Sequence, residues 1–338
     1  MQAYRIPFAA GIAALQATTE TPRALGANEV RIKLHAASLN FRDLMVANGS
    51  YFTKAETPVI PCSDGAGEVI EIGAAVTRAR VGDRTTANFF PHWIGGAQTP
   101  EAIAGSFGGA DDGMLAQEAV VPEHSLVAIP AHLSYLEAAT LPCAAVTAWN
   151  AMFETGNLKP GATVLLLGTG GVSIWALQLA KAAGLKVVIT SSSDEKLARA
   201  KALGADVGIN YRTTPEWQDE VIAATGGRGV DLVVEVGGQG TLARSIAAVR
   251  MGGTVAIIGG VSGFGGEVNP LAMIGGVKKL AGIFVGSRTM FEDMNRLISN
   301  CGIKPVIDRV FQFVEARAAY EHLASGGHFG KVVIQIAD

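Results

Sequence analysis

A glycine-rich turn between an apolar run and a helical pattern constrains the fold of this chain more than any other feature. Residues 164–167 are continuously apolar, and Gly168-Thr169-Gly170-Gly171-Val172-Ser173 follows them directly. Residues 172–183 then carry apolar side chains at helical spacing. A strand that is apolar throughout is typical of a parallel sheet covered on both faces. The order strand, glycine turn, helix therefore predicts the first crossover of a parallel α/β sheet.

The same alternation continues towards the C-terminus. Further apolar strand candidates occur at 187–190, 231–236, 254–258 and 280–285, with helical patterns between them. Ser192 and Glu195 have the spacing of a capping box at the start of a helix. This pattern predicts an α/β fold whose core is a Rossmann doubly wound parallel sheet.

The N-terminal 120 residues have a different pattern of apolar and polar side chains. Residues 30–36 alternate apolar and polar side chains, and 65–72 begins with glycines, as a bulged strand does. Residues 42–47 fit a short helix between them, and 89–113 has no period and is typical of a long loop beside a cleft. We expect one mostly β domain from 1–124 with 286–338, and a dinucleotide-binding domain from 125–285.

Composition limits the class of protein. Of 338 residues, 49% are hydrophobic and 17% charged, which excludes a disordered chain. With 27 basic and 30 acidic residues and no long basic run, we expect no nucleic-acid partner. Cys62, Cys143 and Cys301 are too far apart for a disulfide framework and fit a reducing compartment. No signal-peptide pattern or membrane-length apolar run occurs, so we expect a cytoplasmic protein with no membrane partner.

The glycine turn also predicts a ligand. In a G-x-G-x-x-G loop, the glycines let backbone N–H groups approach a pyrophosphate at a helix N-terminus. The third glycine is replaced here by Ser173, which is small enough for close helix–strand packing. We predict dinucleotide binding at Gly168, Thr169, Gly170, Gly171 and Val172. The alternative is a glycine-rich turn without a ligand.

The end of the second strand bears on the cofactor's identity. An NAD site uses a carboxylate there to bind the ribose 2′-hydroxyl, but this chain has Ser191-Ser192-Ser193. Asp194 and Glu195 are explained as acidic residues in the first turn of a helix. Because hydroxyls and Lys196 suit a 2′-phosphate, the sequence favours NADP(H) over NAD(H).

Several short motifs occur in a fixed order along the chain: Asn40-Phe41-Arg42-Asp43, 60–85, 113–130, 141–149, the Gly168 turn, 201–206, 210–212 and 328–331. With these motifs the chain resembles the medium-chain dehydrogenase/reductase superfamily over nearly its whole length, in the zinc-independent, quinone-oxidoreductase-like branch. The resemblance implies a Rossmann domain plus a mostly β, GroES-like catalytic domain, in a homodimer or homotetramer.

The resemblance also bears on metal binding. Zinc-dependent members of the family bind catalytic zinc at positions that match Asn40, Ser63 and Cys143 here, and a glutamate of theirs matches Asp64. A catalytic zinc needs three His, Cys or carboxylate ligands, and only Cys143 remains. The structural-zinc cysteines would fall in 89–113, which contains none. We therefore expect no zinc, and a buried, unreactive Cys143.

Without zinc, hydride acceptors such as quinones and α,β-unsaturated carbonyls are favoured, because a hydrogen-bond donor suffices to stabilise the product anion. The candidate donors are Tyr51, Asn40 and Asp43. Each has a structural alternative: Tyr51 as packing at the mouth of the cleft, Asn40 as a helix cap, and Asp43 as a cap or a partner of Arg42 or Arg84.

The resemblance and the strand ends together suggest the cofactor contacts. These are Thr147, the Gly168–Val172 turn, Ser191, Ser192, Lys196, Tyr211, Val236, Gly237, Ile258, Gly259, Phe284, Val285 and Ser287, with Phe329 and Lys331 closing the cleft. The favoured function is an NADPH-dependent, zinc-independent quinone or enone reductase. The alternatives are a metal-free NAD(P)-dependent alcohol dehydrogenase or ketone reductase, and a non-catalytic NADPH-binding protein.

Overall fold

The computed structural model describes residues 1–52, 57–265 and 268–337. The chain forms two compact units, unit 1 from Met1–Val146 with Gly286–Asp338, and unit 2 from Thr147–Val285. Residues 125–146, which we expected in the dinucleotide-binding domain, belong to unit 1. The reason is local pairing, because strand β7 (Leu126–Ala128) hydrogen-bonds to β5 (Arg84–Ala87).

Unit 2 contains a six-stranded parallel sheet in the order β10-β9-β8-β11-β12-β13. This is the strand order of a doubly wound dinucleotide-binding fold, confirming the predicted fold class. Its strands are β8 (Thr163–Leu166), β9 (Lys186–Ser191), β10 (Val207–Asn210), β11 (Val230–Glu235), β12 (Val249–Ile257) and β13 (Lys279–Gly282). The predicted 254–258 covers only the C-terminal part of β12 and runs one residue past its end, and the register of β12 against β11 shifts at a bulge. The predicted 280–285 leaves the sheet after Gly282.

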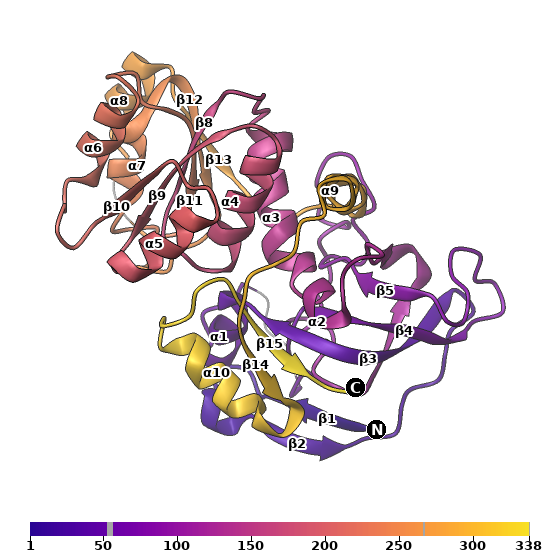
Figure 1. Ribbon diagram of the computed structural model, residues 1–338. Coiled ribbons are helices and arrows are strands. Elements are labelled where there is room, and N and C mark those ends of the chain that lie inside the picture. The colour runs from indigo at the N-terminus through magenta and orange to yellow at the C-terminus, as the bar shows by residue number, and fades with distance from the viewer. Residues whose placement is uncertain (53–56, 266–267, 338) are drawn as a thin grey trace. The chain divides into compact units, whose positions relative to one another are not determined.

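Helices cover both faces of this sheet. Helices α4 (Gly171–Ala182) and α5 (Asp194–Ala202) lie on one face, and α6 (Trp217–Ala224), α7 (Leu242–Ala248) and α8 (Pro270–Gly276) lie on the other (Figure 1). The strands are mostly apolar because their side chains are buried beneath helices: Leu165, Val233 and Val255, for example, pack in one core cluster with residues of α6 and α7. The N-cap of α5 is Ser193, which accepts a hydrogen bond from the backbone N–H of Lys196, and not Ser192 as the capping-box spacing indicated.

Unit 1 is built on a mostly antiparallel sheet in the order β14-β15-β3-β4-β5-β7, with β6 also paired to β3. The strands are β3 (Glu29–Leu39), β4 (Asp64–Ile72), β5, β6 (Glu118–Pro122), β7, β14 (Ile307–Gln312) and β15 (Lys331–Gln335). Strands β1 (Gln2–Arg5) and β2 (Gln16–Thr19) form a separate pair. The antiparallel pairing of β15 with β3 brings the C-terminal segment against the strand that leads to Asn40.

The helices of unit 1 are α1 (Phe41–Asn48), α2 (Tyr135–Ala138), α9 (Arg288–Cys301) and α10 (Ala316–Ala324). Short helical segments also occur at 12–14, 123–125, 141–155 and 313–315, the third including α3 (Val146–Trp149). The expected long loop at 89–113 contains no helix or strand longer than an isolated bridge. Within the described residues, no helix is both long enough and apolar enough to span a membrane.

Candidate active site

The glycine turn of unit 2 lies between β8 and the N-terminus of α4. Gly168 has φ +71°, a left-handed conformation that favours glycine, and a Cβ at this position would meet no atom within 4 Å. Ser173, at the third glycine position, is buried and its hydroxyl donates to the carbonyl of Leu167 at 2.7 Å. The serine thus joins the first turn of the helix to the end of the strand, while the turn itself remains open.

The predicted residues for the adenosine end lie at the ends of two neighbouring strands. Ser191 ends β9 and is paired in register with Asn210 of β10, and the backbone N–H of Tyr211 donates to the Ser191 carbonyl at 3.1 Å. Lys196 lies in the first turn of α5, next to these strand ends. Asp194 accepts from the Asn210 side chain at 2.8 Å, which supports its interpretation as a structural residue.

The ends of β11 and β12 are tied together by backbone hydrogen bonds. The N–H of Ile258 donates to the Glu235 carbonyl at 2.8 Å, and that of Val261 donates to the Val236 carbonyl at 3.1 Å. The Ser262 hydroxyl donates to the Gly237 carbonyl at 2.7 Å. The predicted contacts Val236, Gly237, Ile258 and Gly259 therefore belong to one hydrogen-bonded pair of loops.

The remaining predicted contacts of unit 2 lie at the two ends of the chain segment that forms it. Thr147 is buried in α3, and Phe284 and Val285 follow β13. Val285 has φ +53°, which is unusual for a β-branched residue, and its carbonyl accepts from the Asn150 side chain at 2.7 Å. This bond fixes the backbone at the point where the chain leaves the sheet.

In unit 1, Asn40 and Asp43 lie where β3 turns into α1. The backbone N–H of Asn40, the N-cap residue, donates to Asp43 Oδ2 at 2.8 Å, and Arg42 Nη1 lies 3.2 Å from Asp43 Oδ1. Asp43 thus acts both as a capping residue and as a partner of Arg42. Arg84 donates instead to the Leu133 carbonyl at 2.5 Å.

Arg42 is buried beside Tyr51, and sequence reasoning considered it only as a partner of Asp43. Its Nη1 donates to the carbonyls of Phe107 at 3.0 Å and Gly108 at 2.8 Å. Its guanidinium carbon lies 4.4 Å from the centroid of the Tyr51 ring. A buried arginine fixed between a loop and an aromatic ring is arranged by contacts distant in sequence, and no local pattern signalled it.

Several buried donors in this region make no hydrogen bond of good geometry within the described part of the chain. They are Tyr51 Oη, Asn40 Nδ2, and Arg42 Nε and Nη2. All three residues are more than nine-tenths buried. Because a buried polar group without a partner is costly, this set suits a ligand that brings acceptor oxygen atoms.

Lys331 lies in the same region and is 2% exposed. Its Nζ donates to the Leu39 carbonyl at 2.7 Å and to Asn40 Oδ1 at 2.5 Å, and it lies 3.9 Å from Asp64 Oδ2. Its predicted contact with the cofactor stays a prediction, as do those of Phe329 and Ser287. Phe329 is buried, and the Ser287 hydroxyl caps α9 by accepting from the Met290 N–H at 3.3 Å.

The positions that match zinc ligands in the family do not form a suitable donor set. Asp64 accepts from the Ser63 hydroxyl at 2.7 Å and from the backbone N–H of Cys143 at 3.2 Å. Over residues 1–52, 57–265 and 268–337, no three His, Cys, Asp or Glu side chains are grouped so that they could hold a metal ion. The ammonium group of Lys331 next to Asn40 and Asp64 also disfavours a second cation there.

Burial raises the pKa of two carboxyl groups and one thiol in this region. It raises the pKa of Asp64 above its ordinary value, although Lys331 and the bonds from Ser63 and Cys143 oppose it. It likewise raises the pKa of Asp43, against the effect of Arg42. Burial and the neighbouring Asp64 raise the pKa of Cys143 well above its usual range, which disfavours a thiolate nucleophile.

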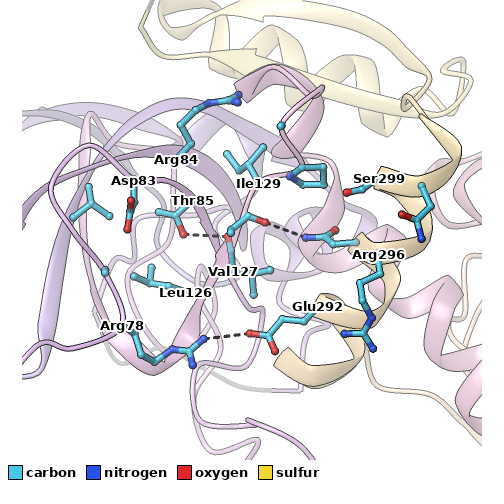
Figure 2. A pocket seen from close by; sticks show the side chains of 17 residues that line it. Arg78, Asp83, Arg84, Thr85, Leu126, Val127, Ile129, Glu292, Arg296 and Ser299 are labelled. Atoms are coloured by element: carbon cyan, nitrogen blue, oxygen red, sulfur yellow. Dashed lines mark hydrogen bonds and ion pairs between the residues drawn. The ribbon is translucent and has the colours of Figure 1, made fainter.

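A separate cavity of about 670 Å³ lies in unit 1 between β5, β7 and α9. Figure 2 shows Arg78 and Glu292 paired across it and the Arg84 side chain directed away from it. Its walls combine apolar residues such as Leu126 and Ile129 with paired charges. None of the predicted catalytic or cofactor-binding residues lines it, so it is not part of the candidate site.

Comparison with known proteins identifies the family. The chain matches the model of the alcohol dehydrogenase GroES-like domain over residues 26–131 and that of the zinc-binding dehydrogenase over residues 171–300. It is 46% identical to a zinc-type alcohol dehydrogenase-like protein of Schizosaccharomyces pombe, over 94% of this chain and 93% of the relative.

Two solved structures resemble the whole chain. An NAD-dependent alcohol dehydrogenase has a TM-score of 0.91 and 32% identity, with 100% of both chains covered. A quinone oxidoreductase of Pseudomonas syringae pv. tomato DC3000 has a TM-score of 0.84 and 27% identity, with 99% of both chains covered. With its GroES-like and doubly wound units, the chain therefore belongs to the medium-chain dehydrogenase/reductase superfamily of oxidoreductases.

Proposed function

We propose that this protein is a zinc-independent, NADPH-dependent oxidoreductase that transfers hydride to a quinone or an α,β-unsaturated carbonyl. The observation that carries the proposal is the set of buried donors without partners on Asn40, Arg42 and Tyr51. Hydride addition to such substrates places negative charge on an oxygen atom, which neutral and cationic donors stabilise. The poor fit of the neighbouring residues to zinc supports the same chemistry.

In the proposed reaction, the reduced nicotinamide supplies the hydride and is itself oxidised. The chain's own residues bind and protonate the substrate. Asn40 Nδ2 and the free Arg42 nitrogens would hold the carbonyl oxygen, and Tyr51 Oη would deliver the proton, which water then replaces. Lys331 would orient Asn40 through its bond to Oδ1.

The preference for NADPH is supported by the strand ends of β9 and β10. Ser191, Ser192, Lys196 and Tyr211 lie on adjacent elements there, and the nearby Asp194 side chain accepts a hydrogen bond from Asn210. Hydroxyl groups and an ammonium suit a 2′-phosphate better than a 2′-hydroxyl. The structurally similar NAD-dependent alcohol dehydrogenase makes NADH the competing cofactor.

The decisive experiment combines metal analysis with cofactor titration and steady-state assays on the purified protein. We expect less than stoichiometric zinc, at least about tenfold tighter binding of NADPH than NADH, and NADPH consumption with quinones or enones. Absence of turnover with all of these acceptors contradicts the proposed reaction. Stoichiometric zinc contradicts the proposed metal independence.

A second candidate is a metal-free alcohol dehydrogenase or ketone reductase, which the names of several relatives favour. Chelator-insensitive oxidation of simple alcohols, exceeding the turnover of quinones, would support it over our proposal. A non-catalytic NADPH-binding protein would bind the cofactor tightly without hydride transfer to any acceptor, and Tyr51→Phe would then change nothing measurable.

We also propose a cytoplasmic homodimer that assembles through unit 2. Strand β13 is at the edge of the parallel sheet, and Leu271, Ile274 and Val277 beside it are 76%, 72% and 65% exposed. Exposed apolar side chains next to an open strand edge are typical of an interface. The three free cysteines support a reducing compartment.

Light scattering after size exclusion tests the assembly. Leu271→Glu with Ile274→Glu should convert a dimer into a monomer, because both changes bury charge in the interface. The control is Val314→Glu, at an 84% exposed position of unit 1. An unchanged mass in the double variant contradicts this surface as the interface.

A further inference from the structure

A completely buried carboxylate at the end of β11, Glu235, has no part in the proposed reaction. Glu235 is 0% exposed, and no ion pair involving it occurs within the described residues. Its Oε1 accepts from the backbone N–H groups of Gly237 at 2.7 Å and Gly238 at 3.0 Å, and from the Thr241 hydroxyl at 2.6 Å. Its Oε2 accepts from the Ser245 hydroxyl. Burying a carboxyl group is costly unless hydrogen bonds compensate it, and these four bonds are what hold Glu235 in this position.

What these bonds determine is the path of the loop after β11. Gly237 and Gly238 turn around the Glu235 carboxylate, and Thr241 and Ser245 attach it to the start of α7. A Cβ on Gly237 would come within 2.3 Å of Thr241 Oγ1, and one on Gly238, with φ +89°, within 2.4 Å of the Gly263 carbonyl. A side chain at either position would therefore clash with neighbouring atoms, so this path of the loop requires both glycines.

The same loop supports its neighbour. The backbone carbonyl of Glu235 accepts from Ile258, that of Val236 from Val261, and that of Gly237 from Ser262. Through these bonds, the position of the β11 loop sets that of the loop after β12. Both loops lie at the carboxyl ends of strands, which is where ligands bind in open parallel sheets.

The strand order indicates which half of a dinucleotide these loops would meet. The glycine turn follows β8, the predicted 2′-phosphate site follows β9 and β10 on one side, and β11 and β12 lie on the other side. A dinucleotide whose pyrophosphate lies at the β8 turn must therefore place its second half over the loops of β11 and β12.

We infer that Glu235 is a positioning residue for the nicotinamide half of the cofactor, acting through the paired loops after β11 and β12. This inference rests on the proposed function. Glu235 itself contacts no ligand atom in this scheme. It fixes the backbone of Val236, Gly237, Ile258 and Gly259, which would form the surface for the nicotinamide ribose and ring.

The test compares two probes on the full chain by calorimetric titration: NADPH, and adenosine 2′,5′-bisphosphate, which carries only the adenosine half. Glu235→Met removes every acceptor at similar volume and should weaken NADPH binding about tenfold or more, because bonds to a charged acceptor are lost. Binding of the bisphosphate should not change. Glu235→Gln keeps an acceptor oxygen for the Oε1 donors and should restore NADPH binding to within about threefold of wild type.

The matched control lies at the other end of the same strand. Asp231 is also a buried carboxylate of β11, bonded to the Thr163 N–H, Arg228 and Arg250. Asp231→Asn should lower the melting temperature and leave the affinity for both probes unchanged. It therefore separates a loss of stability in the sheet from a loss of cofactor positioning.

If Glu235→Met does not fold, Thr241→Val tests the inference instead. It removes one hydrogen-bond donor to Glu235 and keeps the shape of the Thr241 side chain. We expect it to weaken NADPH binding about threefold and leave the bisphosphate unaffected. Wild-type NADPH affinity in Thr241→Val or in a folded Glu235→Met overturns the inference, as does a parallel loss of both probes. A wild-type chain that binds neither NADPH nor NADH refutes the proposed function instead.

Discussion

The two units treat their buried carboxylates in opposite ways. In unit 1, Asp43 and Asp64 lie beside the cations Arg42 and Lys331, yet burial raises the pKa of both. In unit 2, Asp231 is also mostly buried, but the bonds from Thr163, Arg250 and Arg228 outweigh burial and lower its pKa. Burial therefore favours the protonated form of the Asp43 and Asp64 carboxyl groups more than water would, whereas the donors around Asp231 favour its charged form. This is the difference we expect if unit 1 contains the proposed proton-donating site and unit 2 forms the proposed scaffold for cofactor binding.

The largest expected effect comes from removing the cation of the unit 1 cluster. Lys331→Met leaves Asn40 Oδ1 and Asp64 without their ammonium partner, and should lower the free energy of unfolding by about 3 kcal/mol, the usual cost of breaking a buried charge pair. Urea denaturation measures this. Lys304→Met is the control, because Lys304 is 62% exposed in its pair with Glu137 and should contribute less than about 1 kcal/mol. Equal losses of unfolding free energy in both variants would show that the buried Lys331 stabilises the fold no more than the exposed Lys304 does.

The next effect is catalytic. Tyr51→Phe keeps the ring beneath Arg42 and removes only the hydroxyl that has no partner within the described chain. With a quinone or enone, kcat should fall about a hundredfold, because one proton donor is lost. The affinity for NADPH should stay at the wild-type value.

A matched change at another buried tyrosine of unit 1 serves as the control. Tyr4 is 8% exposed and packs edge-on against Phe313 at a centroid distance of 5.1 Å. Tyr4→Phe should leave kcat unchanged. If Tyr51→Phe keeps wild-type kcat, Tyr51 is a packing residue, and Asn40 or Asp43 becomes the candidate donor.

The opposite pKa shifts predict opposite pH slopes. The lowered pKa of Asp231 means that its bonds stabilise the fold at neutral pH, and that this contribution is lost as the pH falls through the lowered folded-state value. Asp231→Asn should therefore cost about 1 to 2 kcal/mol at pH 7 and progressively less in acid. The raised pKa of Asp64 means that the folded protein holds this proton more tightly than the unfolded chain does. Asp64→Asn should therefore cost least at neutral pH and more as the pH falls.

Chemical denaturation of both variants and wild type at several pH values measures these slopes. A parallel pH dependence of the two destabilisations would remove the distinction between the two environments. Both substitutions replace one carboxylate by an amide of the same shape. A difference between their pH dependences therefore reflects the two environments and not the kind of substitution.

The sequence predicted the sheet of unit 2 more closely than the cluster of unit 1. Strands buried on both faces must be apolar throughout, so β8, β9 and β11 were visible as short runs. The same rule predicted β13 to continue to Val285, because Ile283 and Val285 are apolar. The strand ends at Gly282, and Val285 has a left-handed backbone conformation outside the sheet.

The unit 1 cluster depends on contacts that no local pattern carries. Lys331 reaches Asn40 only because β15 pairs with β3, across nearly the whole length of the chain. Arg42 is fixed by the carbonyls of Phe107 and Gly108, which lie more than sixty residues later in the chain. Glu235 was visible only as a polar residue within an apolar strand, and its donors become evident once the glycines after it are seen to turn back around it.

The smallest expected effect concerns the residue that departs from the dinucleotide-binding fingerprint. The Ser173 hydroxyl points at the Leu167 carbonyl and is buried, so it supports the scaffold of unit 2 and does not face the open turn at Gly168. Ser173→Ala should lower the free energy of unfolding by about 1 kcal/mol and leave NADPH affinity unchanged. Ser325→Ala, which removes a 2.7 Å bond to the His322 carbonyl and a 3.1 Å bond from the Gly327 N–H at an exposed position, should cost less. A loss of NADPH affinity in Ser173→Ala would place the hydroxyl in the binding site and weaken the view that unit 2 uses its buried polar groups as scaffold alone.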